Sequence, residues 1–186
     1  MKTNFKKGLF VCVTLLAFMV NSTFAQDTDN TTEKSKKEKR EEARKASLEI
    51  VKAAAQDSMF VIEANTLRGR NTFSQFVSSN TNFVKFEGEE VVIQTANPFG
   101  VGYNGLGGIT LNGDVLQYNL SKDEKGVRII AQISSPFLGH STLNISISAN
   151  GNSNAILRTN RGGYLQIDGD MALLKDSRHY EGTSIL

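Results

Sequence analysis

The chain contains one cysteine and no tryptophan, and it holds only two prolines and two histidines among its 186 residues. The cysteine, Cys12, lies in an apolar N-terminal run, so removal of that run leaves no disulfide, thiolate metal ligand or cysteine nucleophile. The two histidines, His140 and His179, have no sequence neighbours at metal-site spacing. Such a domain must be stabilised by its hydrophobic core, and the ~130 residues that follow position 56 suffice for one.

Residues 1–25 have the three parts of a secretory signal. Three lysines form the basic start, residues 8–20 form an uncharged, mostly apolar run, and Thr23 and Ala25 are the small residues that signal peptidase recognises. The run is too short to cross a bilayer as a stable helix. We therefore expect cleavage after Ala25, no transmembrane span, and a mature protein that begins at Gln26 in the periplasm or outside the cell.

Cleavage of the signal changes the charge balance. The whole chain has 21 basic and 19 acidic residues, and the three lysines of the signal leave 18 basic against 19 acidic residues. Nucleic-acid binding needs a concentrated basic surface, so a mature net charge of −1 gives no reason to expect that partner.

The sequence divides into four segments. Residues 1–25 are the signal, 26–57 a polar leader and charged helix, 58–176 an antiparallel β domain, and 177–186 a C-terminal tail. Within the second segment, residues 26–32 are polar and predict a disordered leader.

Residues 33–56 predict a helix, because they contain strong helix formers and no glycine or proline. The first half is almost entirely charged, so we expect the helix to be solvated at its start and to dock on the β domain at its end. The predicted apolar stripe consists of Ala43, Ala46, Ile50 and Ala54, with Leu48, Val51 and Ala55 beside it. Eight basic residues against five glutamates in 33–52 would suit an anionic membrane surface or cell wall. A solvated spacer is the simpler interpretation.

After Asp57 the hydrophobic period changes from helical to alternating. Residues 143–149 show it most clearly, with four apolar side chains separated by Asn144, Ser146 and Ser148. Turns are predicted at Gly88, at 112–113 (Asn-Gly), at 150–151 (Asn-Gly) and at 161–163 (Arg-Gly-Gly). The sequence therefore predicts a mainly β fold, with about eight antiparallel strands in a meander that forms a flattened barrel or sandwich, preceded by one N-terminal helix.

Four motifs carry a resemblance to a known family. They are 60–65 (FVIEAN), 77–83 (VSSNTNF), 88–94 (GEEVVIQ) and 104–110 (NGLGGIT). The region 58–174 resembles a family of secreted Bacteroidetes proteins that is known only as a domain of unknown function (DUF4251-like). The resemblance implies a bacterial periplasmic or surface location, and it implies no activity and no functional residues.

The longest predicted loop carries the candidate binding residues Asn97, Phe99, Tyr103 and Asn104. Residues 100–105 match a dinucleotide-binding glycine pattern, but a strand follows them where the pyrophosphate needs a helix N-terminus. Aromatic and amide side chains on a long loop favour a recognition role, whereas the glycines also suit a purely structural connection.

The sequence predicts no catalytic residue, no metal ligand and no cofactor. Residues 168–170 (Asp-Gly-Asp) lack the further carboxylates of a calcium loop, and no Ser-His-acid series or nucleophile elbow is present. We therefore expect a non-enzymatic envelope domain that binds a protein or glycan partner, with a carrier of a small apolar ligand in a barrel cavity as the alternative and a hydrolase as a distant one. The sequence carries no indication of the oligomeric state. Bulky side chains predicted to fill the barrel favour the first hypothesis over the carrier: Phe60, Phe83, Phe86, Ile129, Ile145 and Leu165.

Overall fold

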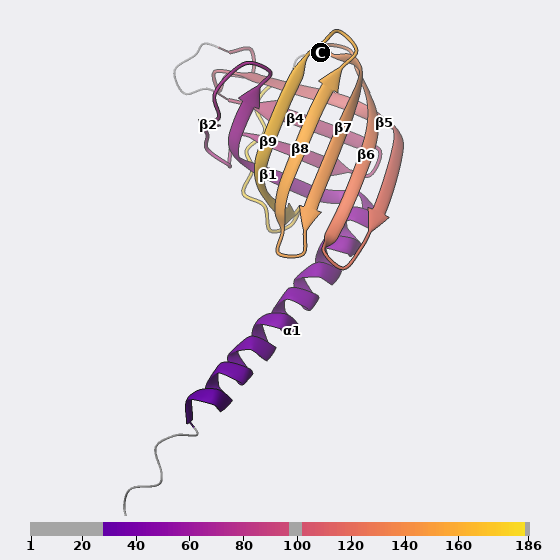
Figure 1. Cartoon of the computed structure of the whole chain (residues 1–186). Helices are drawn as coiled ribbons and strands as arrows, with labels where there is room; N and C mark the ends of the chain where they lie inside the picture. Colours follow the sequence, from indigo (N-terminus) through magenta and orange to yellow (C-terminus); the bar gives the residue numbers. More distant parts are fainter. Residues whose placement is uncertain (1–27, 97–101, 185–186) are drawn as a thin grey trace, which may run out of the picture. The chain divides into compact units, whose positions relative to one another are not determined.

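A computed structural model describes residues 28–96 and 102–184 of the chain, with side chains from residue 35 onward (Figure 1). Over these residues it contains one helix and nine strands. They are α1 (Thr28–Asp57), β1 (Met59–Gly69), β2 (Gln75–Phe76), β3 (Phe83–Glu87), β4 (Glu90–Thr95), β5 (Ile109–Lys122), β6 (Gly126–Ser135), β7 (Gly139–Ser148), β8 (Asn152–Thr159) and β9 (Tyr164–Leu173).

The chain forms two compact units, Met1–Glu42 and Ala43–Leu186. In the first unit, α1 begins at Thr28, so the predicted disordered leader is wrong from residue 28 onward. A helix that has nucleated adds residues at little further cost, which explains why it continues through polar residues. The exposed side chains of residues 35–42 agree with the predicted solvation of this half.

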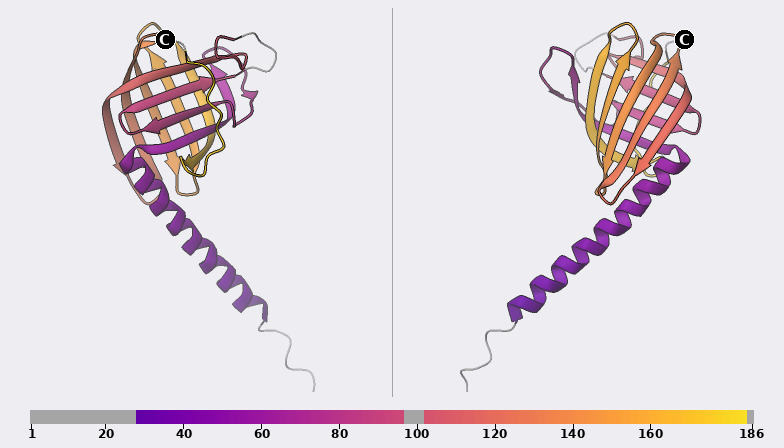
Figure 2. Two further views of the ribbon diagram at one scale, coloured as in Figure 1. Left: turned by 180° about the vertical axis from the view of Figure 1, so that it is seen from behind. Right: turned by 45° about the vertical axis from the view of Figure 1, so that its right-hand side comes forward.

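The second unit is a closed barrel. Each strand is antiparallel to its neighbours in the order β2-β1-β3-β4-β5-β6-β7-β8-β9, and a further pairing of β1 with β9 closes eight strands into a ring. Strand β2 lies outside the ring and pairs with β1 at two positions. Figure 2 shows β1, β3 and β4 crossing the direction of β6–β9, with β5 passing from one group to the other. The predicted meander is confirmed, and pairing of its first and last barrel strands removes the exposed edges that an open sheet would have.

The predicted hairpin turn at 112–113 is wrong. Both residues lie inside β5, which pairs with β4 from Ile109 to Asp114 and then with β6 from Asp114 onward. A Cβ atom at Gly113 would lie 2.8 Å from the carbonyl oxygen of Ser134. The absence of a side chain at Gly113 therefore allows β5 and β6 to lie close together where β5 bends. The pairing of β5 with β4 and β6 overrides the preference of the Asn-Gly sequence for a turn. The other predicted turns are confirmed, with positive φ angles at Gly88, Gly151 and Gly162.

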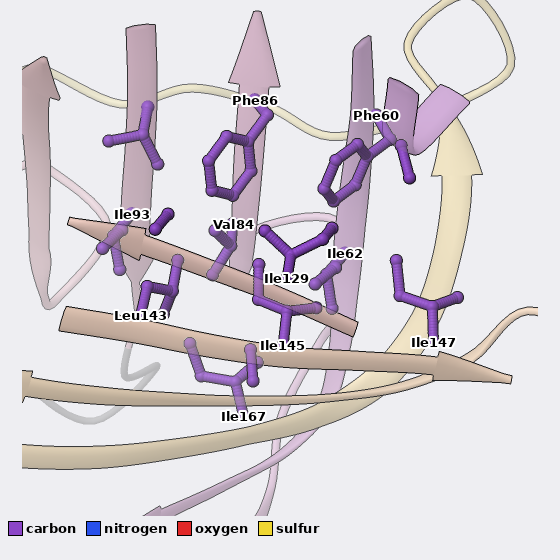
Figure 3. Close-up of a cluster of buried hydrophobic side chains, with 14 of the residues drawn as sticks. Phe60, Ile62, Val84, Phe86, Ile93, Ile129, Leu143, Ile145, Ile147 and Ile167 are labelled. Carbon is purple, nitrogen blue, oxygen red and sulfur yellow. The ribbon is translucent and has the colours of Figure 1, made fainter. Parts of the chain in front are cut away.

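The interior of the barrel is filled by apolar side chains from both groups of strands (Figure 3). Phe60 and Phe86 stack with ring centroids 5.1 Å apart, and the alternating isoleucines of β6 and β7 pack beneath them. The predicted register of β7 is confirmed, since Ile145 is buried and Ser146 is exposed. Phe83 does not fill the barrel as predicted, because it belongs to a second cluster with Val61, Val92 and Leu174.

The last turns of α1 dock on the barrel, as predicted, but through a different stripe. Leu48, Val51, Ala54 and Ala55 are buried, whereas Ile50 is 52% exposed and Ala43 and Ala46 are also exposed. Two features at the end of α1 determine how the helix is rotated about its own axis. Ser58 takes a positive φ of 51° after the last helical residue, and the Tyr118 hydroxyl donates a hydrogen bond of 2.7 Å to the carbonyl oxygen of Ala55.

The C-terminal tail lies across the outer face of β1, β3 and β4 (yellow in Figure 2). Leu174 joins the second apolar cluster, the Ser177 hydroxyl donates to Glu63, and the His179 ring packs on Phe83 with centroids 4.8 Å apart. This cover explains why these strands are buried on both faces.

Candidate functional site

The end of the barrel opposite the junction of α1 and β1 is its open end. It is formed by the loops that follow β1, β4, β6 and β8, and the pairing of Gly69 with Leu165 places the first and last of these side by side. An apolar cavity of about 160 Å³ enters the barrel here. Its lining includes Ile93, Leu111, Leu138, Leu157 and Leu165.

A larger cleft of about 630 Å³ adjoins this cavity, and the two share Thr95 and Leu165 in their walls. Phe76 and Arg68 line one side of the cleft, and Gly108 lines the other. The cleft thus separates the β1–β2 hairpin from the loop between β4 and β5. Its wall combines apolar side chains with polar ones such as Thr72 and Gln75, and its volume lies in the range of ligand-binding clefts.

Asn104, one of the predicted binding residues, is a structural residue of the β4–β5 loop. Only 2% of its surface is exposed, and its side-chain nitrogen donates to the Thr95 carbonyl at 3.0 Å and to the Thr110 hydroxyl at 3.3 Å. Its side-chain oxygen accepts from the backbone amides of Leu106 and Gly108 at 2.9 and 3.0 Å. The amide is therefore occupied in holding the loop closed. The predicted residues Asn97 and Phe99 lie outside the described residues.

The three most exposed aromatic side chains of the open end project from its rim, and Phe137 of the loop after β6 is also 50% exposed. Tyr103, a predicted binding residue, is 83% exposed, and Phe73 and Phe76 of the β1–β2 hairpin are 95% and 92% exposed. Exposed apolar side chains that gather in one part of a surface often mark interaction sites. We call these three residues the aromatic rim.

Gln94 supports the loop from the outer side of β4. Its buried side-chain nitrogen donates to the carbonyl oxygens of Thr81 at 2.9 Å and Tyr180 at 2.8 Å. Its side-chain oxygen accepts from the Thr110 hydroxyl at 2.7 Å and from the Gly182 amide at 2.8 Å. One amide thus links the C-terminal tail to the strand beside the loop.

The DUF4251 family (domain of unknown function) matches residues 38–171 of this sequence. The chain belongs to the DUF4251 family. The crystal structure of a DUF4251 family protein from Bacteroides eggerthii DSM 20697 is similar, with 29% sequence identity and a TM-score of 0.55 over 72% of this chain and 91% of that chain. Among curated proteins, none matches the chain.

A serine, a histidine and a carboxylate of this DUF4251 domain lie together where the tail meets β1. The Ser177 hydroxyl lies 2.6 Å from Glu63 Oε1 and 2.9 Å from His179 Nδ1. The serine donates to the carboxylate and stands between acid and histidine, whereas an activated serine must donate its proton to the histidine. The cluster fastens the tail to β1. Within residues 28–96 and 102–184, no three His, Cys, Asp or Glu side chains lie together as metal ligands would.

The shifted pKa values of the DUF4251 domain occur away from the open end. Burial raises the pKa of Tyr118 to about 12, and a hydrogen bond with Ser58 opposes the shift. Burial lowers the pKa of Lys85, but its hydrogen bond and ion pair with Glu181 outweigh this, so the pKa lies above its usual value. Backbone hydrogen bonds from Lys125 and Gly126 lower the pKa of Asp123. These groups stabilise the helix junction, the tail and a turn.

Sequence reasoning did not identify Phe73 and Phe76 as site residues. Residues 70–82 are polar and show no clear strand period, and the two-residue strand β2 is too short to produce one. The sequence nevertheless holds a usable signal, since Phe73 stands between polar residues in a segment whose only other apolar residues are Phe76 and Val77.

Proposed function

We propose that this protein is a secreted, non-enzymatic binding domain of the cell envelope that contacts its partner through the open end of the barrel. The observation that carries the proposal is the exposure of Phe73, Phe76 and Tyr103 at the open end, where Phe76 also lines a cleft of about 630 Å³. Exposed aromatic side chains provide large contact areas at small cost in side-chain entropy, which is why binding surfaces are rich in them.

The envelope location rests on the signal in residues 1–25. None of the helical residues that the structure describes forms a stretch apolar enough to cross a bilayer. N-terminal mass analysis of the exported protein is expected to start at Gln26. A retained N-terminus would contradict both the location and the mature charge.

The alternative, a carrier of a small apolar ligand, has less support. The cavity that enters the barrel measures only about 160 Å³, whereas sites for small molecules commonly measure ~300–1,000 Å³. Phe60, Phe86 and Ile129 occupy the interior that such a ligand would need. The filled core favours binding at the rim.

The test is capture of binding partners from envelope extract. The rim variant replaces Phe73, Phe76 and Tyr103 with alanine, and the control variant replaces Leu116 and Ile130, which are exposed apolar residues of β5 and β6. We expect the rim variant to lose partners that the wild type and control retain, while circular dichroism shows equal folding. A folded rim variant that captures every wild-type partner would contradict the proposal.

A further inference from the structure

The open end of the barrel carries arginines without acidic neighbours. Arg70 and Arg161 lie in the loops after β1 and β8, and Arg68 and Arg158 lie at the adjoining strand ends. The sequences of these two loops and of the loops after β4 and β6 contain no aspartate or glutamate. Among the described residues, none of these four arginines forms an ion pair. Their charge is therefore available to an anionic partner.

The opposite end carries charges of both signs, since the β5–β6 turn at 122–125 (Lys-Asp-Glu-Lys) lies at the same end as the acidic β3–β4 turn. The β3–β4 turn carries Glu87, Glu89 and Glu90, and its Gly88 amide donates to the carbonyl oxygen of Ser58 where α1 ends. Although the mature chain is close to neutral, its barrel has one end with charges of both signs and one basic, aromatic end. An anionic surface would therefore orient the barrel with its open end toward that surface.

The acidic residue of the tail does not cancel this charge. Glu181 pairs with Lys85 at 3.0 Å on the outer face of β3, and Lys85 also lies 3.4 Å from Glu87. The charges of Glu181 and Lys85 thus neutralise each other on the outer wall of the barrel.

The aromatic rim stands beside these arginines. Arg68 and Phe76 line the same cleft, and the Arg158 guanidinium lies 5.7 Å from the ring centroid of Tyr164. Aromatic rings concentrate at the boundary between lipid headgroups and acyl chains, and guanidinium groups bind phosphates through paired hydrogen bonds. Phe73 in the β1–β2 turn and Phe76 in β2 are almost fully exposed, as shallow insertion into an interface requires.

We propose that the open end docks on an anionic phospholipid surface, with the phenylalanines in the interface and the arginines on the headgroup phosphates. The inference rests on the proposed function and names the partner class of the same surface. Double-stranded nucleic acid offers phosphates but neither an apolar layer nor unstacked bases for Phe73 and Phe76. An acidic protein surface is the alternative partner, and the experiment below distinguishes it from a lipid surface.

The experiment is flotation of the mature chain with vesicles of phosphatidylcholine, with or without phosphatidylglycerol. We expect binding only to the phosphatidylglycerol vesicles, weakened by salt. A surface cation contributes ~1 kcal/mol, or about fivefold, so R70Q/R161Q is expected to bind about 30-fold more weakly. The matched control, K36Q/K37Q, makes the same charge change on α1 and should bind within about twofold of the wild type. F73A/F76A should also lose binding while remaining folded.

The following outcomes would contradict the lipid proposal. Equal loss in R70Q/R161Q and K36Q/K37Q would indicate attraction by charge in general, and undiminished binding of F73A/F76A would exclude insertion of the hairpin. If no vesicle binds the wild type while envelope capture still depends on Phe73 and Phe76, the partner is a protein and the proposed function stands without the lipid. If capture is also independent of the rim, both proposals are wrong.

Discussion

Replacing Gln94 with alanine tests how strongly the C-terminal tail stabilises the barrel. The change removes four buried hydrogen bonds, two to the barrel at Thr81 and Thr110 and two to the tail at Tyr180 and Gly182. Each such bond contributes ~1 kcal/mol net, and buried groups left unpaired cost ~1–3 kcal/mol more. We expect the free energy of unfolding to fall by about 3–5 kcal/mol, a large part of the ~5–15 kcal/mol of an ordinary domain.

The assay is urea unfolding followed by circular dichroism. Gln132→Ala is the matched control, because Gln132 is an exposed glutamine of β6 and its replacement should change the free energy of unfolding by no more than ~0.5 kcal/mol. Equal midpoints for the two variants would show that the Gln94 network contributes nothing measurable.

A double-mutant cycle tests whether Gln94→Ala lowers stability through its bonds to the tail. Deletion of residues 177–186 removes the same two tail bonds that Gln94→Ala removes, so the combined variant should lose about 2 kcal/mol less than the sum of the separate losses. Additivity within ~0.5 kcal/mol would refute the reasoning, because it would mean that Gln94 and the tail act independently.

Four further predictions follow from particular side chains and segments. Ile145→Asp buries an unpaired carboxylate and should unfold the domain, whereas Ser146→Asp should leave the thermal midpoint nearly unchanged. Gly126→Ala should lose several kcal/mol in urea unfolding, since its Cβ atom would lie 2.0 Å from the carbonyl oxygen of Ile147 at a φ of 157°. Absorbance titration should show Tyr118 ionising at about pH 12. Because the pKa of Tyr118 is raised in the folded state, the stability that this group contributes should be lost as the pH rises from about 10 to 12, and Tyr118→Phe should remove this pH dependence. Deletion of residues 26–42 should shift the melting temperature by only a few degrees, because the described side chains of this segment are exposed, and an unfolded deletion variant would show that it has a hidden structural role.

The tail and the buried amides were not predictable from the sequence. Gln94 follows three apolar residues of β4, and Asn104 lies among glycines, so local pattern suggests an exposed strand end and an exposed loop. Both are buried because the C-terminal tail, distant in the chain, lies against them: residues 180–182 contact Gln94, and the Thr183 amide donates to the carbonyl oxygen of Asn104 at 3.2 Å. Burial of a polar group depends on such long-range partners, which periodicity does not report.

The sequence by itself determined the strand content, most of the turns and the register of β6 and β7. An alternation of apolar and polar residues leaves a strand only one face to bury, and glycines at turns accept positive φ angles that other residues resist. Tertiary structure alone decided that β1 pairs with β9 to close the barrel, that Leu48 and Val51 rather than Ile50 dock the helix, and that Gly113 bends a strand. It also decided that Phe73 and Phe76 stand exposed at the same end as Tyr103. The physical reason is that strand pairing, helix rotation and the grouping of loops at one end are set by contacts between distant segments, whereas periodicity and turn chemistry act within a few residues.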